Sequence, residues 1–270
     1  MSGSNKEIEG EILSIFRNLV NDAIDYLKTG YRSNPDRKSF NKTSLETDRL
    51  KTEKASDYLS NKLSDEKRKT IVNKLEDTIQ EKARKLREIS DEIANCKKCS
   101  LYLKRLNPVA GEGSPDADIM FIGEGPGEME DIKGKPFVGR AGKLLTKMLS
   151  AINLTREEVF ITNVVKCRPP GNRTPLPNEV NACFPYLERQ IEVVQPMIIC
   201  CLGGPAIKTI LGVSQGISKL RGNIYRYKDI PVIPTYHPAA VLRFPDKYRR
   251  PVWNDLKMLR DLYKDLKSET

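Results

Sequence analysis

Four of the six cysteines have a spacing that suits metal ligands. Cys96 and Cys99 form a CxxC pair, and Cys167 and Cys183 lie far downstream of it, outside the apolar runs. Thiolates bind zinc and iron–sulfur clusters, so four of them can hold one metal centre. A CxxC pair alone is a weak indication, because redox dithiols and buried core cysteines share it. The other two cysteines lie within the apolar run PMIICCLG and are predicted to be core residues.

A glycine-rich turn, GEGPGEMEDIKGKPFVGRAG at residues 123–142, directly follows the apolar run DIMFI. Glycine lets the backbone approach a ligand closely, and turn amides can bind an anion. The turn is not a dinucleotide-binding fingerprint, because Glu128 stands where the third glycine belongs and the carboxylates nearby would repel a pyrophosphate. Carboxylates beside such a turn suit general-base work or the shaping of a substrate pocket. A solvated acidic loop is the alternative.

The only histidine of the chain, His237, lies in TYHPAAVLRFP at the end of another apolar run. A single histidine is more often structural than catalytic. Its place at the end of an expected strand makes it a candidate donor, base or ligand.

The residues after about 115 alternate short apolar runs with helix-like stretches. The runs are ADIMFIG, EVFITNVV, PMIICCLG and IPVIPTY, and the stretches between them include AGKLLTKMLSAI and NEVNACFPYLERQIEVV. This alternation predicts an α/β fold in which helices cover both faces of a parallel sheet. Ligands of such sheets bind beyond the carboxyl ends of the strands, so the glycine turn, Asn163 to Cys167 and His237 are expected at one edge.

The N-terminal third has a different texture. Residues 6–28 carry one apolar helical stripe, and residues 30–57 are too polar to form a core, which predicts a helix followed by a linker. From Ser64, a candidate N-cap, a charged helical pattern runs toward the CxxC pair. We therefore expect a helical, partly disordered extension over residues 1–88 and a separate domain over residues 89–270.

The composition favours a polyanionic partner. The net charge is +10, with 39% apolar and 30% charged residues. Such an excess suits nucleic acid or an anionic membrane surface, and charge alone does not separate the two. The start MSGSNKEIEGE lacks the apolar stretch of a signal peptide, and no apolar run is long enough to span a bilayer, so a cytoplasmic protein is expected.

Taken together, these motifs resemble the family 4 uracil-DNA glycosylases over about residues 93–267. The resemblance rests on GEGPGEMED, TNVVKCRPP and HPAAV in this order, together with the cysteine spacing. It implies a three-layer α/β/α domain around a four-stranded parallel sheet, and an enzyme that flips uracil out of DNA and hydrolyses its N-glycosidic bond to leave an abasic site. It also implies a [4Fe-4S] cluster, whose ligands would be Cys96, Cys99, Cys167 and Cys183.

The resemblance also implies roles for the pocket residues. His237 would donate a hydrogen bond to the uracil O2, and the Asn163 amide would read the O4 and N3–H edge. Phe137 would stack on the flipped base, although an ordinary core phenylalanine is the alternative. Glu130 would line the side of the pocket that rejects the C5 methyl of thymine.

The remaining expected site residues lie on either side of this pocket. Gly125 stands where the GQDPYH family of uracil glycosylases has an aspartate, so Glu124 is the candidate for activating water, with backbone carbonyls and Asn163 as alternatives. The segment AAVLRFP is expected to form a loop that enters the DNA. Leu242 would be its wedge and Arg243 its phosphate or base contact.

Several alternatives stay open at this point. A noncatalytic iron–sulfur protein that binds nucleic acid would explain the cysteines and the charge, and a zinc-bearing nucleotide-binding enzyme would explain the thiols and the glycine turn. Under the resemblance, the partner is uracil-containing DNA, single- or double-stranded, with no membrane, and the location is cytoplasmic and nucleoid-associated. The extension would bind a replication or repair protein, add nonspecific DNA contacts, or solubilise the enzyme.

Overall fold

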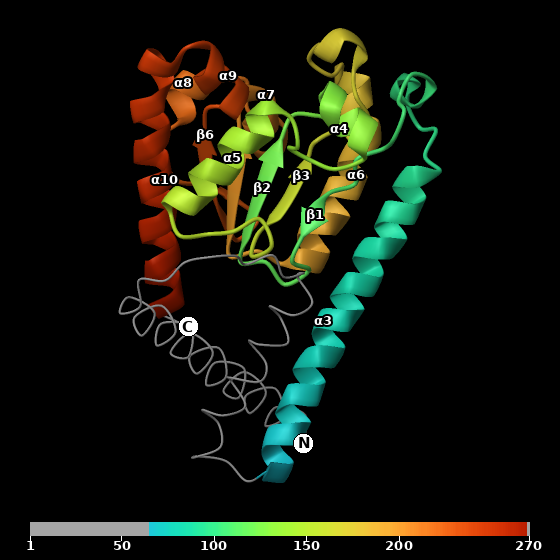
Figure 1. Cartoon of the computed structure of the whole chain (residues 1–270), viewed down its shortest axis with the longest axis vertical. Coiled ribbons are helices and arrows are strands. Elements are labelled where there is room, and N and C mark those ends of the chain that lie inside the picture. The colour runs from blue at the N-terminus through green and yellow to red at the C-terminus, as the bar shows by residue number, and fades with distance from the viewer. Residues whose placement is uncertain (1–64, 269–270) are drawn as a thin grey trace, which may run out of the picture. The chain divides into compact units, whose positions relative to one another are not determined.

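A computed structural model describes residues 65–268 of the chain (Figure 1). The helix predicted over residues 6–28 and the linker over residues 30–57 lie outside the described residues. The charged helix predicted after Ser64 is confirmed as α3 (Asp65–Ala94), which runs through residue 88 without interruption. A compact unit begins within this helix and spans Ile79–Tyr263. This unit carries every predicted site residue, and it is the unit described below.

The four predicted strands are confirmed as the parallel centre of the sheet. They are β2 (Ile119–Gly123), β3 (Phe160–Asn163), β4 (Ile198–Leu202) and β6 (Ile230–Thr235). Every residue of β2, β3 and β4 is buried, as expected of strands covered on both faces. The two cysteines of PMIICCLG lie in β4 and are core residues, as predicted.

The sheet has six strands rather than the four expected, in the order β1-β3-β2-β4-β6-β5. The two additional strands are β1 (Glu112–Gly113) and β5 (Tyr225–Tyr227), which pair antiparallel with β3 and β6 at the two edges. They carry no apolar run because edge strands are covered on fewer sides, so the pattern that predicted the central strands does not mark them.

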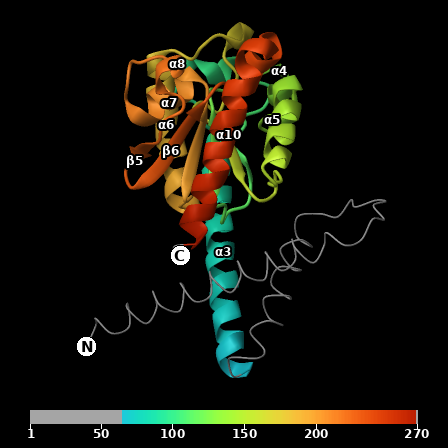
Figure 2. The same cartoon turned by 90° about the vertical axis from the view of Figure 1, so that its left-hand side faces the viewer.

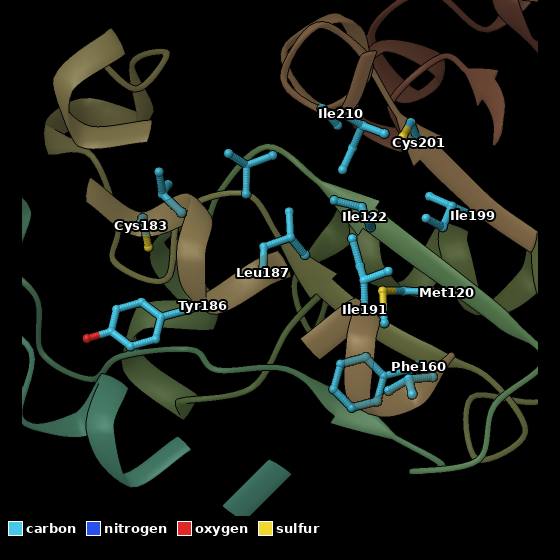
Figure 3. Close-up of a cluster of buried hydrophobic side chains, with 14 of the residues drawn as sticks. Met120, Ile122, Phe160, Cys183, Tyr186, Leu187, Ile191, Ile199, Cys201 and Ile210 are labelled. Carbon is cyan, nitrogen blue, oxygen red and sulfur yellow. The ribbon is translucent and has the colours of Figure 1, made fainter. Parts of the chain in front are cut away.

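Helices cover both faces of the sheet, which confirms the three-layer arrangement (Figures 1 and 2). On one face α6 (Pro177–Val194) and α7 (Gly204–Leu211) share a core with the end of α3. Figure 3 shows Leu187 and Ile191 of α6 packed toward Met120 and Ile122 of β2. The other face carries α5 (Arg140–Ala151) and α10 (Pro245–Ser268). Among residues 65–268, no helix is long and apolar enough to cross a membrane.

Short helical turns connect these layers at the carboxyl edge of the sheet. They are η2 (Ser100–Leu103), α4 (Glu128–Lys133), η3 (Pro170–Asn172), α8 (Ile217–Leu220) and α9 (Pro238–Arg243).

A buried carboxylate fixes α10 to the end of β6. Asp255 is 2% exposed and accepts hydrogen bonds from the Thr235 hydroxyl at 2.7 Å and from the Arg221 guanidinium at 2.6 and 3.0 Å. Because Thr235 is the last residue of β6, this contact sets the direction in which the chain leaves the sheet toward His237.

Candidate active site and metal-binding cavity

The adjacent ends of β2 and β3 bring two predicted site segments into contact. Gly123 pairs with Asn163 in the parallel register. A Cβ atom built on Gly123 would lie 2.3 Å from Asn163 Oδ1 and 2.6 Å from the Phe137 ring. Because Gly123 has no side chain, the Asn163 amide and the Phe137 ring can both occupy the space beside it.

The Asn163 side chain has an unused acceptor. The residue is 1% exposed, and its Oδ1 has no hydrogen-bond partner among the described residues. Buried side-chain acceptors are nearly always satisfied, and an exception calls for a ligand or another explanation. Because Asn163 is the last residue of β3, at the edge of the sheet where ligands of such folds bind, a bound ligand is the natural partner.

The buried Phe137 ring packs against His237. Its ring centroid lies 5.5 Å from that of His237, at an interplanar angle of 35°. Its φ of +51° is rare for an aromatic residue, so the surrounding contacts must hold it. Arg156 supplies two of them by donating to the carbonyl oxygens of Pro136 and Phe137 at 2.8 and 3.2 Å.

His237 presents one ring nitrogen to the pocket as a donor. Its Nδ1 accepts a hydrogen bond from the Ala239 backbone N–H at 3.1 Å, so the neutral ring carries its proton on Nε2. Burial lowers the pKa of His237 to about 4, and the negative charge of Glu130 opposes this shift. Near neutral pH the side chain is therefore an uncharged hydrogen-bond donor.

Glu130 holds the loop that carries Phe137. Its Oε1 accepts hydrogen bonds from the backbone N–H groups of Val138 and Gly139, both at 2.8 Å. Gly139 is the N-cap of α5, so the carboxylate also meets the positive end of that helix. The side chain is fixed close to the ring pair of Phe137 and His237.

Glu124 and Gly125 lie just beyond β2 but turn toward the loop after β3. A Cβ on Gly125 would lie 2.7 Å from Val165 Cγ2, so the glycine allows close packing of the two loops. Burial raises the pKa of the half-buried Glu124, and a hydrogen bond from Thr174 opposes the shift. Among the described residues, no hydrogen bond links Glu124 to Asn163 or His237.

The segment after His237 is a helix and not the expected loop. It forms α9, in which Pro238 occupies the first turn and the His237 side chain caps the start. Proline at this position and the helix formers Ala239 and Ala240 favour a helical turn instead of the loop that was predicted. Leu242 is 49% exposed on this helix, and Arg243 is exposed beside it.

The four predicted metal ligands surround one cavity. Cys96 and Cys99 follow α3, Cys167 follows β3 and Cys183 lies on α6, and all four line the same space. Burial raises the pKa of the Cys183 thiol to about 11. Within residues 65–268, no three His, Cys, Asp or Glu side chains are close enough together to hold a single metal ion.

Arg105 also lines this cavity, a position that was not predicted from the sequence. Its Nη1 donates to Cys167 Sγ at 3.1 Å and to the Ile93 carbonyl at 3.3 Å, while Nη2 donates to the Ala94 carbonyl at 2.6 Å. The guanidinium thus caps the last turn of α3 and ties it to a predicted ligand.

Lys166 is a second missed residue. It lines the cavity and is 1% exposed, and its ammonium bonds three oxygen atoms close to Asn163. Burial lowers its pKa to about 7, and the Cys183 sulfur opposes the shift. The only sequence signal for Lys166 was its place beside Cys167.

Asp131 is a third functional residue that the sequence did not predict. Its carboxylate accepts hydrogen bonds from the backbone N–H groups of Leu106 and Asn107, and it therefore holds the loop after the CxxC pair against α4.

Residues 110–257 match the family model described as the uracil DNA glycosylase superfamily. The chain belongs to this superfamily. Within it, a type-4 uracil-DNA glycosylase of Sulfurisphaera tokodaii is 50% identical over 186 residues, which cover 66% of this chain and 84% of the relative. Another of Saccharolobus solfataricus is 55% identical over 167 residues, or 58% and 77% of the two chains.

A type-5 uracil-DNA glycosylase of Pyrobaculum aerophilum is less similar, at 30% identity over 152 residues, which cover 50% of this chain and 66% of the relative. The predicted resemblance to the family 4 uracil-DNA glycosylases is confirmed, and the type-4 relatives are more similar to this chain than the type-5 enzyme is. These matches identify the enzyme class, and the roles of single residues are argued from the geometry above.

Gly123→Ala is expected to fold but to lose uracil excision, the activity after which the superfamily is named, by at least about 100-fold, because the new methyl group displaces Asn163 or Phe137. The measurement is the single-turnover rate on a labelled oligonucleotide with one uracil. Gly204→Ala is the matched control, since a Cβ there meets nothing within 4 Å. Equal rates for Gly123→Ala and the wild type would show that this space is not the pocket.

The single histidine should stay neutral between about pH 5 and 8, with its proton on Nε2, because burial holds its pKa below this range. Nitrogen-15 NMR of the imidazole in tag-free protein measures both properties without assignment ambiguity, since the chain has one histidine. Protein unfolded in denaturant is the control and should titrate near about 6.5. The same midpoint in the folded protein would contradict the assigned state.

Proposed function

We propose that this protein excises uracil from DNA by hydrolysing the N-glycosidic bond, which leaves an abasic site and begins base excision repair. The observation that carries the proposal is the pocket at the carboxyl ends of the central strands. There the neutral His237 donor, the unpaired Asn163 amide and the Phe137 ring lie together. The relatives named type-4 uracil-DNA glycosylases support the same activity.

The Asn163 amide suits uracil and disfavours cytosine. Uracil presents an acceptor at O4 and a donor at N3–H, so the Asn163 NH₂ group donates to the first and its Oδ1 accepts from the second. Cytosine has an acceptor at N3 and a donor at its amino group, which reverses both partners and leaves buried polar groups unpaired. The free Oδ1 of Asn163 supports this reading.

His237 stabilises the leaving base. Cleavage of the N-glycosidic bond gives an oxocarbenium-like sugar and places negative charge on uracil. A hydrogen bond from His237 Nε2–H to the uracil O2 strengthens as that charge develops. The low pKa of His237 means that the ring acts as a neutral donor and need not transfer its proton.

Two carboxylates near the end of β2 have separate roles in this proposal. We assign activation of water to Glu124, since burial raises its pKa and makes it a better proton acceptor near neutral pH. Glu130 forms a rigid wall, because two backbone N–H donors fix its carboxylate. Thymine differs from uracil only by its C5 methyl group, so a side chain that excludes thymine must be held rigidly.

The DNA contact extends along α9. This short helix follows His237 directly, and its exposed residues Leu242 and Arg243 are placed to fill the gap left by the flipped base and to contact the backbone. The net charge of +10 attracts the phosphate chain over a longer range.

The cysteine cavity suits a [4Fe-4S] cluster. Four thiolates around a single zinc ion converge on one point, whereas each cysteine of a cluster binds its own iron and the sulfur atoms lie farther apart. All four cysteines line one cavity, so one metal centre can use all four of them. Arg105 and Lys166 add positive charge beside them. Once bound, the cluster would cross-link the loop after α3, the loop after β3 and α6.

His237→Ala and Asn163→Ala should keep DNA affinity and lose excision by about two orders of magnitude or more, because each removes a contact to the base and not to the backbone. Alkaline cleavage of an oligonucleotide with one uracil measures excision, with a thymine oligonucleotide as the substrate control. Wild-type protein that binds DNA but releases no uracil would instead favour the noncatalytic iron–sulfur alternative.

Purified protein should be brown, absorb near about 400 nm and contain iron and acid-labile sulfide, because thiolate-to-iron charge transfer produces that band. Cys167→Ala should lose the band. Cys201→Ala is the control and should retain it, since Cys201 lies in the core of β4 and does not line the cavity. A colourless protein with one bound zinc would contradict the cluster.

A further inference from the structure

Lys166 occupies an unusual position between the pocket and the cysteine cavity. Its Nζ donates hydrogen bonds to Thr162 Oγ1 at 2.7 Å, to the Asn163 carbonyl at 2.8 Å and to Gln190 Oε1 at 2.7 Å. An ammonium group has three N–H donors, and all three are used. These bonds fix the end of β3 at the residue whose side chain faces the base.

The network around this ammonium is itself anchored. Gln190 Nε2 donates to the Ala110 carbonyl at 2.8 Å, and the Thr162 hydroxyl lies 2.9 Å from the same oxygen. Thr162 and Gln190 are 0% and 2% exposed. The side chains of Thr162 and Gln190 are therefore fixed, and they hold the Lys166 ammonium in place. The ammonium in turn holds the backbone carbonyl of Asn163.

The three oxygen acceptors around Lys166 Nζ suit its charged ammonium form, and a buried ammonium needs a counter-charge. Within the described part of the chain, Lys166 forms no ion pair with a carboxylate. A buried charge without a partner is costly. The side chain lines the cavity of the four cysteines, and its backbone N–H donates to Cys183 Sγ at 3.3 Å. A metal centre held by four thiolates carries the negative charge that is otherwise missing.

We propose that Lys166 is a positioning residue that links the metal centre to base recognition. A cluster held by the four cysteines would compensate the buried charge of Lys166, and the three hydrogen bonds of Lys166 hold Asn163 in register with Gly123. This inference rests on the proposed uracil excision and gives the cluster a part in the pocket without any electron transfer. It also explains why a basic residue is buried directly beside Cys167.

The deciding experiment is a double-mutant cycle between Lys166→Met and Asn163→Ala, measured in cluster-loaded protein as the single-turnover rate of uracil excision. Lys166→Met keeps the length of the side chain and removes its donors. We expect a loss of about 10- to 100-fold in this rate, with unchanged affinity for DNA that carries an abasic site. In the Asn163→Ala background, Lys166→Met should have little further effect, since it acts through the missing amide.

A merely structural lysine gives a different pattern. The two losses would then multiply in the double variant, and the affinity for abasic DNA would fall together with the rate. Either result, or a wild-type rate in Lys166→Met, overturns the proposal. Lys82→Met is the control. Lys82 is partly buried and bonds Asp116 and the Val194 carbonyl, but it does not line the cavity, so its loss should leave the rate unchanged.

One further measurement and one replacement variant keep the possible outcomes distinguishable. The visible absorption per protein shows whether Lys166→Met retains its cluster. If this variant does not fold or loses the band, Gln190→Met replaces it in the cycle, because Gln190 bonds Lys166 but does not line the cavity. The cycle then decides as before, through non-additivity with Asn163→Ala. Failure of the wild type to release uracil would reject the proposed function itself, whereas an active wild type with additive variants rejects only the role of Lys166.

Discussion

The Asn163 amide has room at the end of β3 only because Gly123, its partner in β2, has no side chain. The parallel register sets these two residues side by side, and a slip by one residue would turn the amide to the other face of the sheet. Phe137 closes the same space, and the turn after β6 brings His237 against Phe137. The pocket is therefore a consequence of strand register before it is a set of functional groups.

This dependence explains which parts of the fold the sequence predicts. The central strands are buried on both faces, so continuous apolar runs mark them, and the glycine turn and His237 follow those runs directly. The edge strands β1 and β5 take their strand conformation from a neighbour and carry no such pattern. The segment AAVLRFP was expected to be a loop that enters the DNA, although Pro238 and the alanines after it suit the first turn of a helix.

The residues of the candidate site also fall into a group that the sequence predicts and a group that it does not. Asn163, Phe137 and His237 lie in local motifs, and the structure brings them together as those motifs predict. The roles of Arg105 and Lys166 depend on partners far along the chain, such as Cys167 for Arg105 and Gln190 for Lys166. Basic residues are mostly solvated, so a sequence alone places them on the surface. Only packing shows that these two face a cavity of thiols.

Burial keeps His237 neutral although a carboxylate lies close to it. An unscreened Glu130 would raise the pKa of His237 and favour the imidazolium. Two backbone N–H groups at the start of α5 instead bind the Glu130 carboxylate and absorb part of its charge. The cations Arg105 and Lys166 lie on the cavity side, beside the thiols. The site thereby keeps a neutral donor at His237, while the cations Arg105 and Lys166 lie apart from it, beside the thiols.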